Sequence, residues 1–337
     1  MKLIVDAMGG DHAPEQIVRG AFLGMKKDED IELIFTGDEK AIRAAMEKYD
    51  IPEKGIEIVH TPVKIEMEED PLCILKSKKD SSMAMGLALL RDGKGDAFLS
   101  AGSTGALIVG ASSRVYKVKL PGVRRVGIGA VLPLSCPVLL LDSGANIEIS
   151  PEEMLQFGYM GKAYAKGVLG VKEPRVALVN NGAEECKGTA LYVESHKLLK
   201  DAKNLNFVGN IEGRDIPLGE ADVILCDGFV GNVILKLSEG FGKFISKELK
   251  KMLGGSLRGK IAALFIYSDL KKFKSRLSYE RYGGAPFLGT RYPVIKAHGS
   301  SKASAIKSAV LQAKKCYESK VCEMLARDME QGEREEH

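Results

Sequence analysis

The chain has 337 residues and a mass of 36.5 kDa, with 45% hydrophobic and 28% charged residues. This balance is typical of a globular chain with a sizeable core, and it excludes intrinsic disorder, a collagen-like repeat and a coiled-coil rod. The net charge of +4, from 49 basic and 45 acidic side chains, is too small to make nucleic acid the main partner.

The cysteines and the apolar runs indicate the compartment. None of the six cysteines forms a C-x-x-C pair or lies at zinc-finger spacing from a histidine, so we expect no metal ion and reduced thiols. After Met1 and Lys2, only three apolar residues precede Asp6, so we expect no signal peptide. The longest apolar run, near 138–141, is far short of the roughly 20 residues that cross a bilayer. The sequence therefore predicts a cytoplasmic chain that is not integral to a membrane.

Short β-rich apolar runs recur along the chain, and most of them end in glycine with a polar neighbour. Runs without polar alternation are typical of strands that are buried on both faces. The predicted strands are Leu3–Val5, Glu32–Phe35, Ala97–Leu99, Val138–Leu141, Val176–Val179 and Val223–Leu225.

Helical apolar spacing fills the stretches between these strands. Ser150 precedes Pro151 and two glutamates, a pattern that predicts an N-cap with a proline in the first turn. The alternation predicts βαβ units and an α/β fold, with a mostly parallel sheet flanked by helices, over residues 1–329; the tail 330–337 is expected to fray. The predicted helices are Pro14–Lys27, Ala41–Tyr49, Met83–Arg91, Pro151–Gly167, Thr189–Leu199 and Lys302–Met329.

Five predicted strands end in loops that mix small and polar residues, at 6–12, 100–105, 142–146, 180–187 and 227–232. Ligands bind beyond the carboxyl ends of the strands in an open parallel sheet. Each loop alone is equally well explained as an ordinary turn. A structural turn needs glycine but not so many Asp, Asn, Ser and Thr neighbours. Five such loops at the same end of one sheet predict a shared polar crevice.

The loop 100–105, Ser-Ala-Gly-Ser-Thr-Gly, runs directly into a helical stretch. Backbone N–H groups exposed by glycine and the positive end of a helix favour a phosphate or another anion. The alternative is a capped helix with Ser103 or Thr104 as the N-cap and no ligand.

The common catalytic signatures are missing. The sequence has no G-x-x-x-x-G-K-[ST], no G-x-G-x-x-G after a strand, no H-E-x-x-H and no G-x-S-x-G, which disfavours P-loop, zinc and serine hydrolases. His12 and His298 lie in glycine-rich polar runs and are candidates for the site, although each is equally well explained as a hydrogen-bonded structural histidine. The remaining titratable candidates are Glu184, Lys187 and Asp227.

The segment 243–276 is strongly basic. It holds ten Lys and Arg against Glu248 and Asp269, a net charge of +8, which leaves −4 for the rest of the chain. Its centre, 261–267, is apolar. Such a segment favours a membrane interface or an acidic protein partner. The alternative is a helix whose apolar face packs in the core or in a dimer interface.

Eight blocks in one order carry a family resemblance: Val5–Pro14, Ser100–Leu107, Leu141–Asn146, Gln156–Gly161, Phe207–Asp215, Cys226–Val233, Tyr282–Pro286 and Lys296–Ser301. They resemble the PlsX family of acyl-acyl-carrier-protein:phosphate acyltransferases. The chain departs from the family at Ser103, where asparagine is common, and in the segment 181–188.

The resemblance implies a two-lobed fold with a cleft, like the isocitrate and isopropylmalate dehydrogenases and the phosphotransacetylases, assembled as a homodimer. It implies transfer of a fatty acyl group from acyl carrier protein to inorganic phosphate, without a cofactor. The acyl phosphate would start phospholipid synthesis. A membrane-bound glycerol-3-phosphate acyltransferase of the PlsY type would take it at the anionic inner face of the cell membrane, where the protein would associate peripherally.

This chemistry needs residues that hold phosphate and donors for the oxyanion of the attacked thioester. We hypothesise that Lys187 and the amides of 102–105 hold phosphate, that Asn232 or His298 donates to the oxyanion, and that His12 or Asp11 orients the phosphate. The further substrate-binding candidates are Asp6, Gly9, Gly10, Gly102, Ser103, Thr104, Gly105, Asn146, Glu184 and Asp227. Leu264, Phe265 and Ile266 are expected at the membrane, and Lys271, Lys272 and Lys274 at the carrier protein.

Three alternatives stay open at this point. A nicotinamide-dependent decarboxylating dehydrogenase of the same fold needs metal-binding aspartates and clustered arginines, and no such arginine cluster is visible. A non-enzymatic membrane scaffold would bind carrier protein without phosphate-dependent turnover. An enzyme that makes short acyl phosphates from coenzyme A thioesters would differ in its preference for the carrier.

Overall fold

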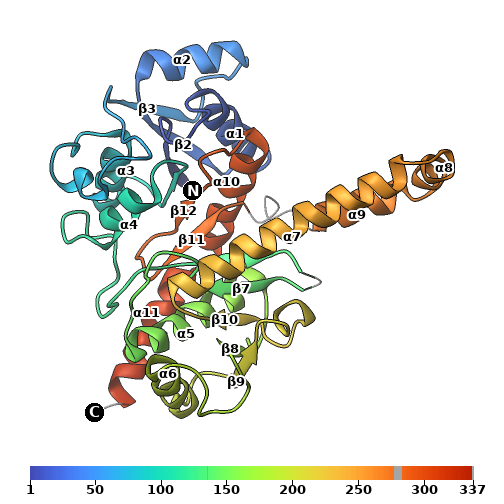
Figure 1. The fold of residues 1–337 in the computed structure, drawn as a ribbon. Helices are drawn as coiled ribbons and strands as arrows, with labels where there is room; N and C mark the ends of the chain where they lie inside the picture. The colour runs from blue at the N-terminus through green and yellow to red at the C-terminus, as the bar shows by residue number, and fades with distance from the viewer. Residues whose placement is uncertain (135, 277–282, 336–337) are drawn as a thin grey trace.

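A computed structural model describes residues 1–134, 136–276 and 283–335, which form two sheets surrounded by helices (Figure 1). The larger sheet has seven strands in the order β3-β2-β1-β4-β12-β11-β5, and the smaller has five in the order β6-β7-β10-β8-β9. The predicted α/β class and two-lobed architecture are confirmed. The expectation of one sheet beneath all five polar loops is wrong, because β1 and β4 lie in the larger sheet and β7, β8 and β10 in the smaller.

The six predicted strands are present, and they are buried as their unalternated runs predict. They are β1 (Lys2–Asp6), β2 (Glu32–Gly37), β4 (Ala97–Ser100), β7 (Val138–Leu141), β8 (Val176–Asn180) and β10 (Val223–Leu225). The strands not predicted are β3 (Ile56–His60), β5 (Gly127–Ile128), β6 (Ala130–Leu132), β9 (Phe207–Glu212), β11 (Ala285–Leu288) and β12 (Val294–Lys296). Pairing is parallel except that β11 runs antiparallel to β12 and β5, and β6 to β7.

Helices pack against these sheets close to the predicted positions. The predicted N-cap is a full capping box: Ser150 Oγ accepts from the Glu153 backbone N–H, and the Glu153 carboxylate accepts from the Ser150 backbone N–H at 2.9 Å. The helices are α1 (Glu15–Met25), α2 (Glu39–Lys48), α3 (Ser82–Arg91), α4 (Thr104–Ser112), α5 (Pro151–Tyr164), α6 (Ala190–Asp201), α7 (Gly228–Gly254), α8 (Leu257–Phe265), α9 (Tyr267–Arg276), α10 (Ala303–Glu318) and α11 (Val321–Glu335).

The C-terminal helical stretch differs from its prediction. The expected helix over 302–329 is two helices, because the chain turns at Ser319 and at Lys320, which has a positive φ of 53°. Helix α11 continues to Glu335, across most of the tail that the sequence predicts to fray. Residues 336–337 and the side chains from 330 onward lie outside the described residues.

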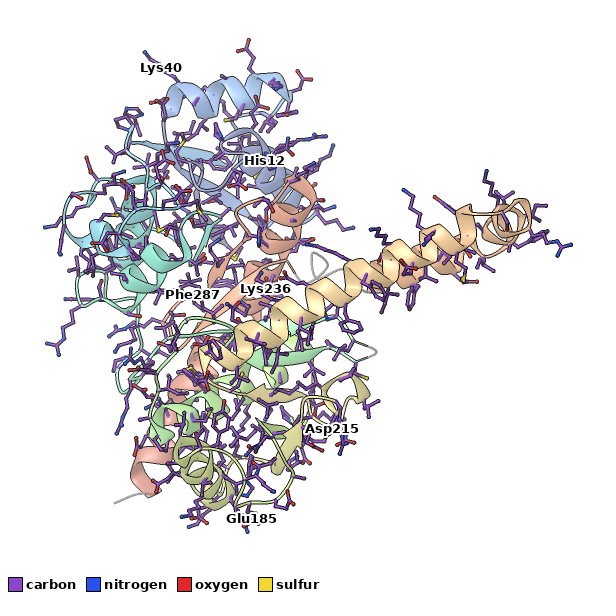
Figure 2. The ribbon with its side chains drawn as sticks, viewed as in Figure 1. His12, Lys40, Glu185, Asp215, Lys236 and Phe287 are labelled. Atoms are coloured by element: carbon purple, nitrogen blue, oxygen red, sulfur yellow. The ribbon has the colours of Figure 1, made fainter. Side chains whose placement is uncertain are left out.

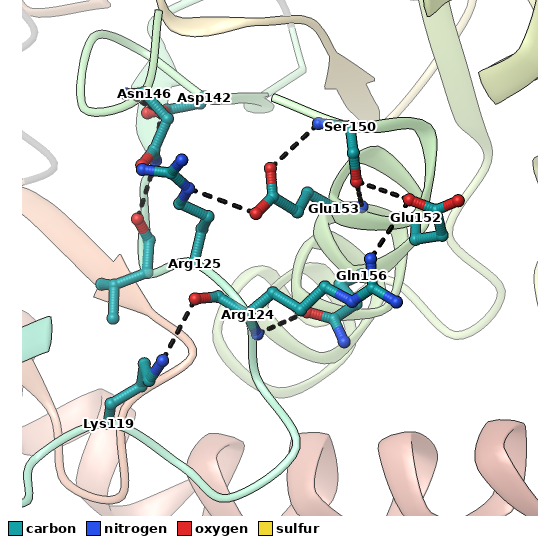
Figure 3. Close-up of polar contacts among 10 residues, drawn as sticks. Lys119, Arg124, Arg125, Asp142, Asn146, Ser150, Glu152, Glu153 and Gln156 are labelled. Carbon is teal, nitrogen blue, oxygen red and sulfur yellow. Dashed lines mark hydrogen bonds and ion pairs between the residues drawn. The ribbon is translucent and has the colours of Figure 1, made fainter. Parts of the chain in front are cut away.

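The chain crosses between the two sheets at Gly129, because β5 ends at Ile128 in the larger sheet and β6 begins at Ala130 in the smaller. Hydrogen bonds and ion pairs hold the segment before this crossing against the start of α5 (Figure 3). The Arg124 backbone N–H donates to Gln156 at 2.9 Å, and Arg125 pairs with Glu153 at 3.2 Å. These contacts fix the crossing segment relative to the smaller sheet.

Helix α7 leaves the body of the molecule, and its outer part forms an arm together with α8 and α9, with α8 at the far end (Figure 1). We use the name arm for the basic segment 243–276. Many of its apolar side chains are exposed. Among the described residues, no helix has the length and apolar character needed to cross a membrane.

Candidate active site

A cavity of about 430 Å³ is lined by residues of both sheets and by the loops that follow their strands. Four of the five polar loops contribute to it, through Asp11, Thr104, Ser143 with Gly144, and Asn232. The segment 296–301 after β12 completes the polar part of the wall. Apolar side chains, among them Met67, Ile128, Val131 and Leu235, line the rest. The cavity therefore offers both a polar site and an apolar surface at the carboxyl ends of the strands.

Asp6 holds together the loops that follow β1 and β4. Its buried carboxylate accepts from Ser100 Oγ at 2.6 Å and from the Met8 backbone N–H at 3.2 Å. Burial raises the pKa of Asp6, and these hydrogen bonds oppose that shift. A Cβ on Gly9 would come within 2.6 Å of both this carboxylate and the Gly102 nitrogen, so only glycine fits there. Asp6 and Gly9 thus support the site and are not among the residues that line the cavity.

The glycine loop combines the two interpretations that its sequence allows. Ser103 is the N-cap of α4, with its hydroxyl accepting from the Ala106 backbone N–H at 3.4 Å, and its side chain is buried. Thr104, the next residue, lines the cavity. A Cβ on Gly105 would lie 2.7 Å from the ring of Pro71, and a Cβ on Gly102 would lie 2.9 Å from the terminal methyl of Met83, so the loop is tightly packed at both positions. The helix is capped, and its N-terminus also opens onto the cavity.

Helix α7 carries Asn232 to the cavity. Its N-cap, Asp227, accepts from the backbone N–H groups of Phe229 and Val230 at 2.9 Å and from the Tyr192 hydroxyl at 2.7 Å. A Cβ on Gly231 would lie 1.8 Å from the Asp142 carbonyl oxygen, so this glycine lets the first turn of α7 rest directly on the 142–146 loop. Asp227, a predicted substrate contact, is buried with its oxygens engaged in this capping arrangement.

The 142–146 loop is organised around Asp142 (Figure 3). This fully buried carboxylate accepts from the backbone N–H groups of Ile128, Ala145 and Asn146 at 2.7–3.1 Å. The Asn146 side-chain amide donates to Asp142 at 2.8 Å and to the Val126 carbonyl at 2.9 Å. Asn146, a predicted substrate contact, is buried in this network and does not line the cavity.

The two predicted histidines differ in position. His298 lines the cavity, and its Nδ1 lies 3.2 Å from the Ser300 backbone nitrogen and 2.9 Å from Ser300 Oγ. Asp11 also lines it, and its backbone N–H donates to the Gly299 carbonyl at 2.9 Å, which joins the first loop to the last. Gly10, which has a φ of +100°, lies in the same joint. His12 is exposed on the N-terminal loop and is outside the cavity lining (Figure 2).

Lys187 and Glu184 lie in the loop after β8, the one polar loop that contributes nothing to the cavity lining. Both side chains are exposed. The loop is fixed by its backbone, because the Glu184 carbonyl accepts from Asn210 Nδ2 at 2.9 Å and from the Lys187 N–H at 3.1 Å. Strand β8 pairs with β10, so this loop emerges at the same edge of the smaller sheet as Asp227.

Lys296 is a residue of the site that the sequence analysis missed. It ends β12, the residue is only 7% exposed, and it lines the cavity. Burial lowers the pKa of its ammonium group to about 8, against the opposing influence of Asp6 and Asp11. A lysine between Ile295 and Ala297 in a buried strand is the signal that could have identified it. Among the described residues, no three His, Cys, Asp or Glu side chains gather in a way that suits a metal ion.

Several known proteins resemble this chain over nearly its full length. A phosphate acyltransferase of Clostridium acetobutylicum is 43% identical over 332 residues, 98% of this chain and 99% of that protein. One of Alkaliphilus oremlandii is 46% identical over 327 residues, 97% of this chain and 96% of that protein. One of Thermoanaerobacter pseudethanolicus is 44% identical over 331 residues, 98% of each.

Solved phosphotransacetylases share the fold. The enzyme from Streptococcus pyogenes superimposes with a TM-score of 0.62 at 17% identity, over 96% of this chain and 94% of that chain. The EutD phosphotransacetylase from Staphylococcus aureus gives a TM-score of 0.56 at 15% identity, over 94% of each chain. A family model described as fatty acid synthesis protein matches residues 1–324. With this match and relatives above 40% identity over the whole chain, the protein belongs to that family, the phosphate acyltransferases of the PlsX type.

Proposed function

We propose that this protein transfers a fatty acyl group from the thioester of acyl carrier protein to inorganic phosphate, releasing acyl phosphate and free carrier protein. Family membership supports acyl transfer to phosphate. The observation that carries the proposal is the cavity itself. Polar groups and a helix N-terminus, suited to an anion, share it with an apolar wall suited to the start of an acyl chain.

The reaction needs no covalent acyl-enzyme and no co-reactant. An oxygen of hydrogen phosphate attacks the thioester carbonyl carbon, the carbon–sulfur bond breaks, and the thiolate leaves with the proton that the phosphate loses. The protein's tasks are to position phosphate against the carbonyl and to stabilise the negative charge that develops on its oxygen.

Among the cavity residues, Asn232 and His298 are the proposed donors to this oxyanion, and Asp11 orients the phosphate with Thr104 beside it. Lys187 and the nearby Glu184 lie in the loop after β8, and both are proposed to contact the incoming acyl thioester. His12 is proposed to assist Asp11 from outside the cavity lining. Asp6, Asn146 and Asp227 then support the site through the contacts described above.

The test is acyl-phosphate formation from purified acyl carrier protein thioester with and without inorganic phosphate. We expect product only with phosphate, and faster turnover with the carrier-protein thioester than with the matching coenzyme A thioester. Asn232→Ala and Lys187→Ala should lower the rate at least tenfold, with the exposed Lys40→Ala as the control. Near wild-type rates for both variants would remove these residues from the proposed site. Carrier binding without turnover would instead support a scaffold.

The arm is the proposed contact for the carrier protein. Acyl carrier proteins are strongly acidic, and the segment 243–276 has a net charge of +8, so the two attract each other. Lys271, Lys272 and Lys274 are proposed to make this contact; their side chains lie outside the described residues.

The far end of the arm is the proposed membrane contact. Leu264 and Phe265 are 78% and 85% exposed, and Ile266 is 42% exposed. Apolar tips beside basic residues favour the interface of an anionic membrane. We place the protein in the cytoplasm, associated peripherally with the inner face of the cell membrane. There a PlsY-type glycerol-3-phosphate acyltransferase would receive the acyl phosphate for phospholipid synthesis.

Helix α7 is the proposed homodimer interface. One face of it carries exposed apolar side chains at a spacing of three or four residues: Phe229, Val233, Leu237, Phe241 and Phe244, each more than half exposed. Asn232, Leu235, Lys236 and Glu239 lie on a different face and line the cavity. We call Phe229, Val233, Leu237, Phe241 and Phe244 the apolar stripe. A second copy of the chain that covers the apolar stripe leaves the cavity face of α7 free.

A further inference from the structure

Lys296 is a buried cation in the wall of the cavity. Its Nζ donates to the Ala101 carbonyl at 3.3 Å and also to the Ala297 carbonyl. An ammonium group has three N–H donors. Two are thus engaged within the described part of the chain, and one remains for whatever occupies the cavity.

The described residues supply no carboxylate within ion-pair distance of this ammonium group. The charged and titratable groups that surround it are Asp6 on β1, Asp11 in the following loop, and His298 on its own segment. Lys236 and Glu239 on α7 line the same cavity and pair with each other at 3.0 Å. A buried charge without a partner of opposite charge is costly unless a ligand of opposite charge binds next to it. The position of Lys296 therefore favours binding of an anion in the cavity.

The lysine and the glycine loop converge on the same part of the wall. The carbonyl that Lys296 binds belongs to Ala101, the residue directly before Gly102. Thr104, in the first turn of α4, lines the same cavity. A helix N-terminus contributes positive partial charge and free backbone N–H groups. Together these groups suit a small tetrahedral dianion better than a carboxylate-bearing diacid, which calls for the planar fork of arginine.

We propose that Lys296 is the residue that binds the phosphate nucleophile in this cavity, next to Thr104. The proposal rests on the proposed function and deepens it, since it assigns the phosphate to a buried lysine of the larger sheet. Lys187, which the sequence analysis expected to hold phosphate, is exposed in the loop after β8 of the smaller sheet. In this proposal Lys187 contacts the acyl thioester instead.

The first test measures phosphate binding without any acyl donor. Inorganic phosphate should raise the melting temperature of the wild type and give a titratable heat by calorimetry. Lys296→Met, which keeps an unbranched side chain of similar size and removes the charge, should abolish both signals. Lys302→Met is the matched control, because Lys302 is an exposed lysine directly after the segment 296–301, at the N-cap of α10, and does not line the cavity. The control should bind phosphate as the wild type does.

The second test separates binding from folding and from general electrostatics. Lys296→Met should raise the KM for phosphate at least tenfold and leave the KM for the acyl donor within twofold. In the wild type the KM for phosphate should rise as the pH passes 8, because the lysine loses its proton. Lys296→Arg keeps a charge at every accessible pH, so it should bind phosphate and lose this alkaline rise.

The outcomes distinguish the proposal from the function on which it rests. A wild type that binds phosphate through Lys296 but forms no acyl phosphate leaves the binding site standing and removes the proposed reaction. An active Lys296→Met variant with the wild-type KM for phosphate overturns the inference and leaves the reaction intact. If circular dichroism shows Lys296→Met to be unfolded, Lys296→Arg decides: retention of the wild-type alkaline rise overturns the assignment.

Discussion

The pKa of Lys296 links its ligand role to the stability of the protein. Burial lowers this pKa from 10.5 to about 8, and 2.5 pKa units correspond to roughly 3 kcal/mol at 1.36 kcal/mol per unit. Between pH 8 and 10.5 the unfolded chain binds more protons than the native one at this site. The contribution of Lys296 to the free energy of unfolding therefore rises with pH over this window, and below pH 8 the lysine opposes folding.

Lys296→Met should consequently be at least as stable as the wild type at pH 7. Removing the charge relieves that penalty, which is partly offset by about 1–3 kcal/mol for the carbonyls that lose a donor. The difference in unfolding free energy, mutant minus wild type, should fall between pH 8 and 10.5. Urea denaturation at pH 7 and 9.5 measures it. A difference that grows with pH contradicts the assigned direction of the pKa shift.

Asp227 tests whether a predicted ligand residue is in fact a structural cap. Asp227→Ala removes the acceptor for two backbone N–H groups of α7 and for the Tyr192 hydroxyl, which should cost about 1–3 kcal/mol of unfolding free energy. Asp227→Asn keeps a side-chain oxygen for the cap and should cost less than half as much. Thermal unfolding compares the two. A stable Asp227→Ala variant that no longer binds phosphate would return this residue to the substrate site.

At the scale of elements, most of the fully buried apolar runs were predictable, whereas the partly buried β3 and β9 and very short strands such as β5 and β6 were not. Strands such as β1 and β7 carry their burial in their own sequence. Strands β5 and β6 have only two or three residues, and they exist because distant strands supply their hydrogen bonds. Local sequence carries no signal for such pairing, so the crossing at Gly129 could not be predicted, and the two-lobed architecture was expected only from the family resemblance.

The same limit applies to the site residues. Aspartate and asparagine after a strand suit a ligand and a helix cap equally well, because the same oxygen serves both. Only the fold separates Asn232, which lines the cavity, from Asn146 and Asp227, which are engaged inside the protein. Lys296 has a signal, a lysine between Ile295 and Ala297, but it becomes informative only once β12 is known to be a buried strand.

The apolar stripe on α7 gives a prediction for assembly. The rings of Phe241 and Phe244 pack edge to face at 6.3 Å and lie exposed near the middle of the helix. Phe241→Glu with Phe244→Glu should convert a dimer into a folded monomer, since charges in an apolar interface are strongly unfavourable. Ser238→Glu, exposed on the same helix outside the stripe, is the control. Sedimentation equilibrium measures the oligomeric state of both variants. A double variant that still dimerises rules the stripe out as the interface.

For the molecule as a whole, the uneven charge predicts how the carrier approaches. Changing Lys271, Lys272 and Lys274 to Glu should raise the KM for acyl carrier protein severalfold and flatten its dependence on salt, because the Debye length is about 10 Å at 0.1 M. Lys26 and Lys27, directly after α1, and Lys40 on α2 give the same change in net charge when they are changed to Glu. Lys40 lies far from the end of the arm (Figure 2). Equal effects of the two triple variants would mean that only net charge matters and that the arm is not the docking surface.

The end of the arm should determine binding to membranes. Leu264 and Phe265 each contribute roughly 1.5–3 kcal/mol if fully buried in the interface, and each nearby basic residue adds about 1 kcal/mol on an anionic surface. The proposed dimer would present two arms, so that weak single contacts combine by avidity. Leu264→Glu with Phe265→Glu should abolish co-sedimentation with anionic liposomes and leave the melting temperature and acyl transfer unchanged, because both side chains are already exposed.

Leu218→Glu is the control, since Leu218 is 72% exposed on the smaller lobe, and it should bind liposomes as the wild type does. A double variant that melts many degrees lower would show that these residues pack against protein in solution, and one that still sediments fully would exclude the arm as the membrane contact.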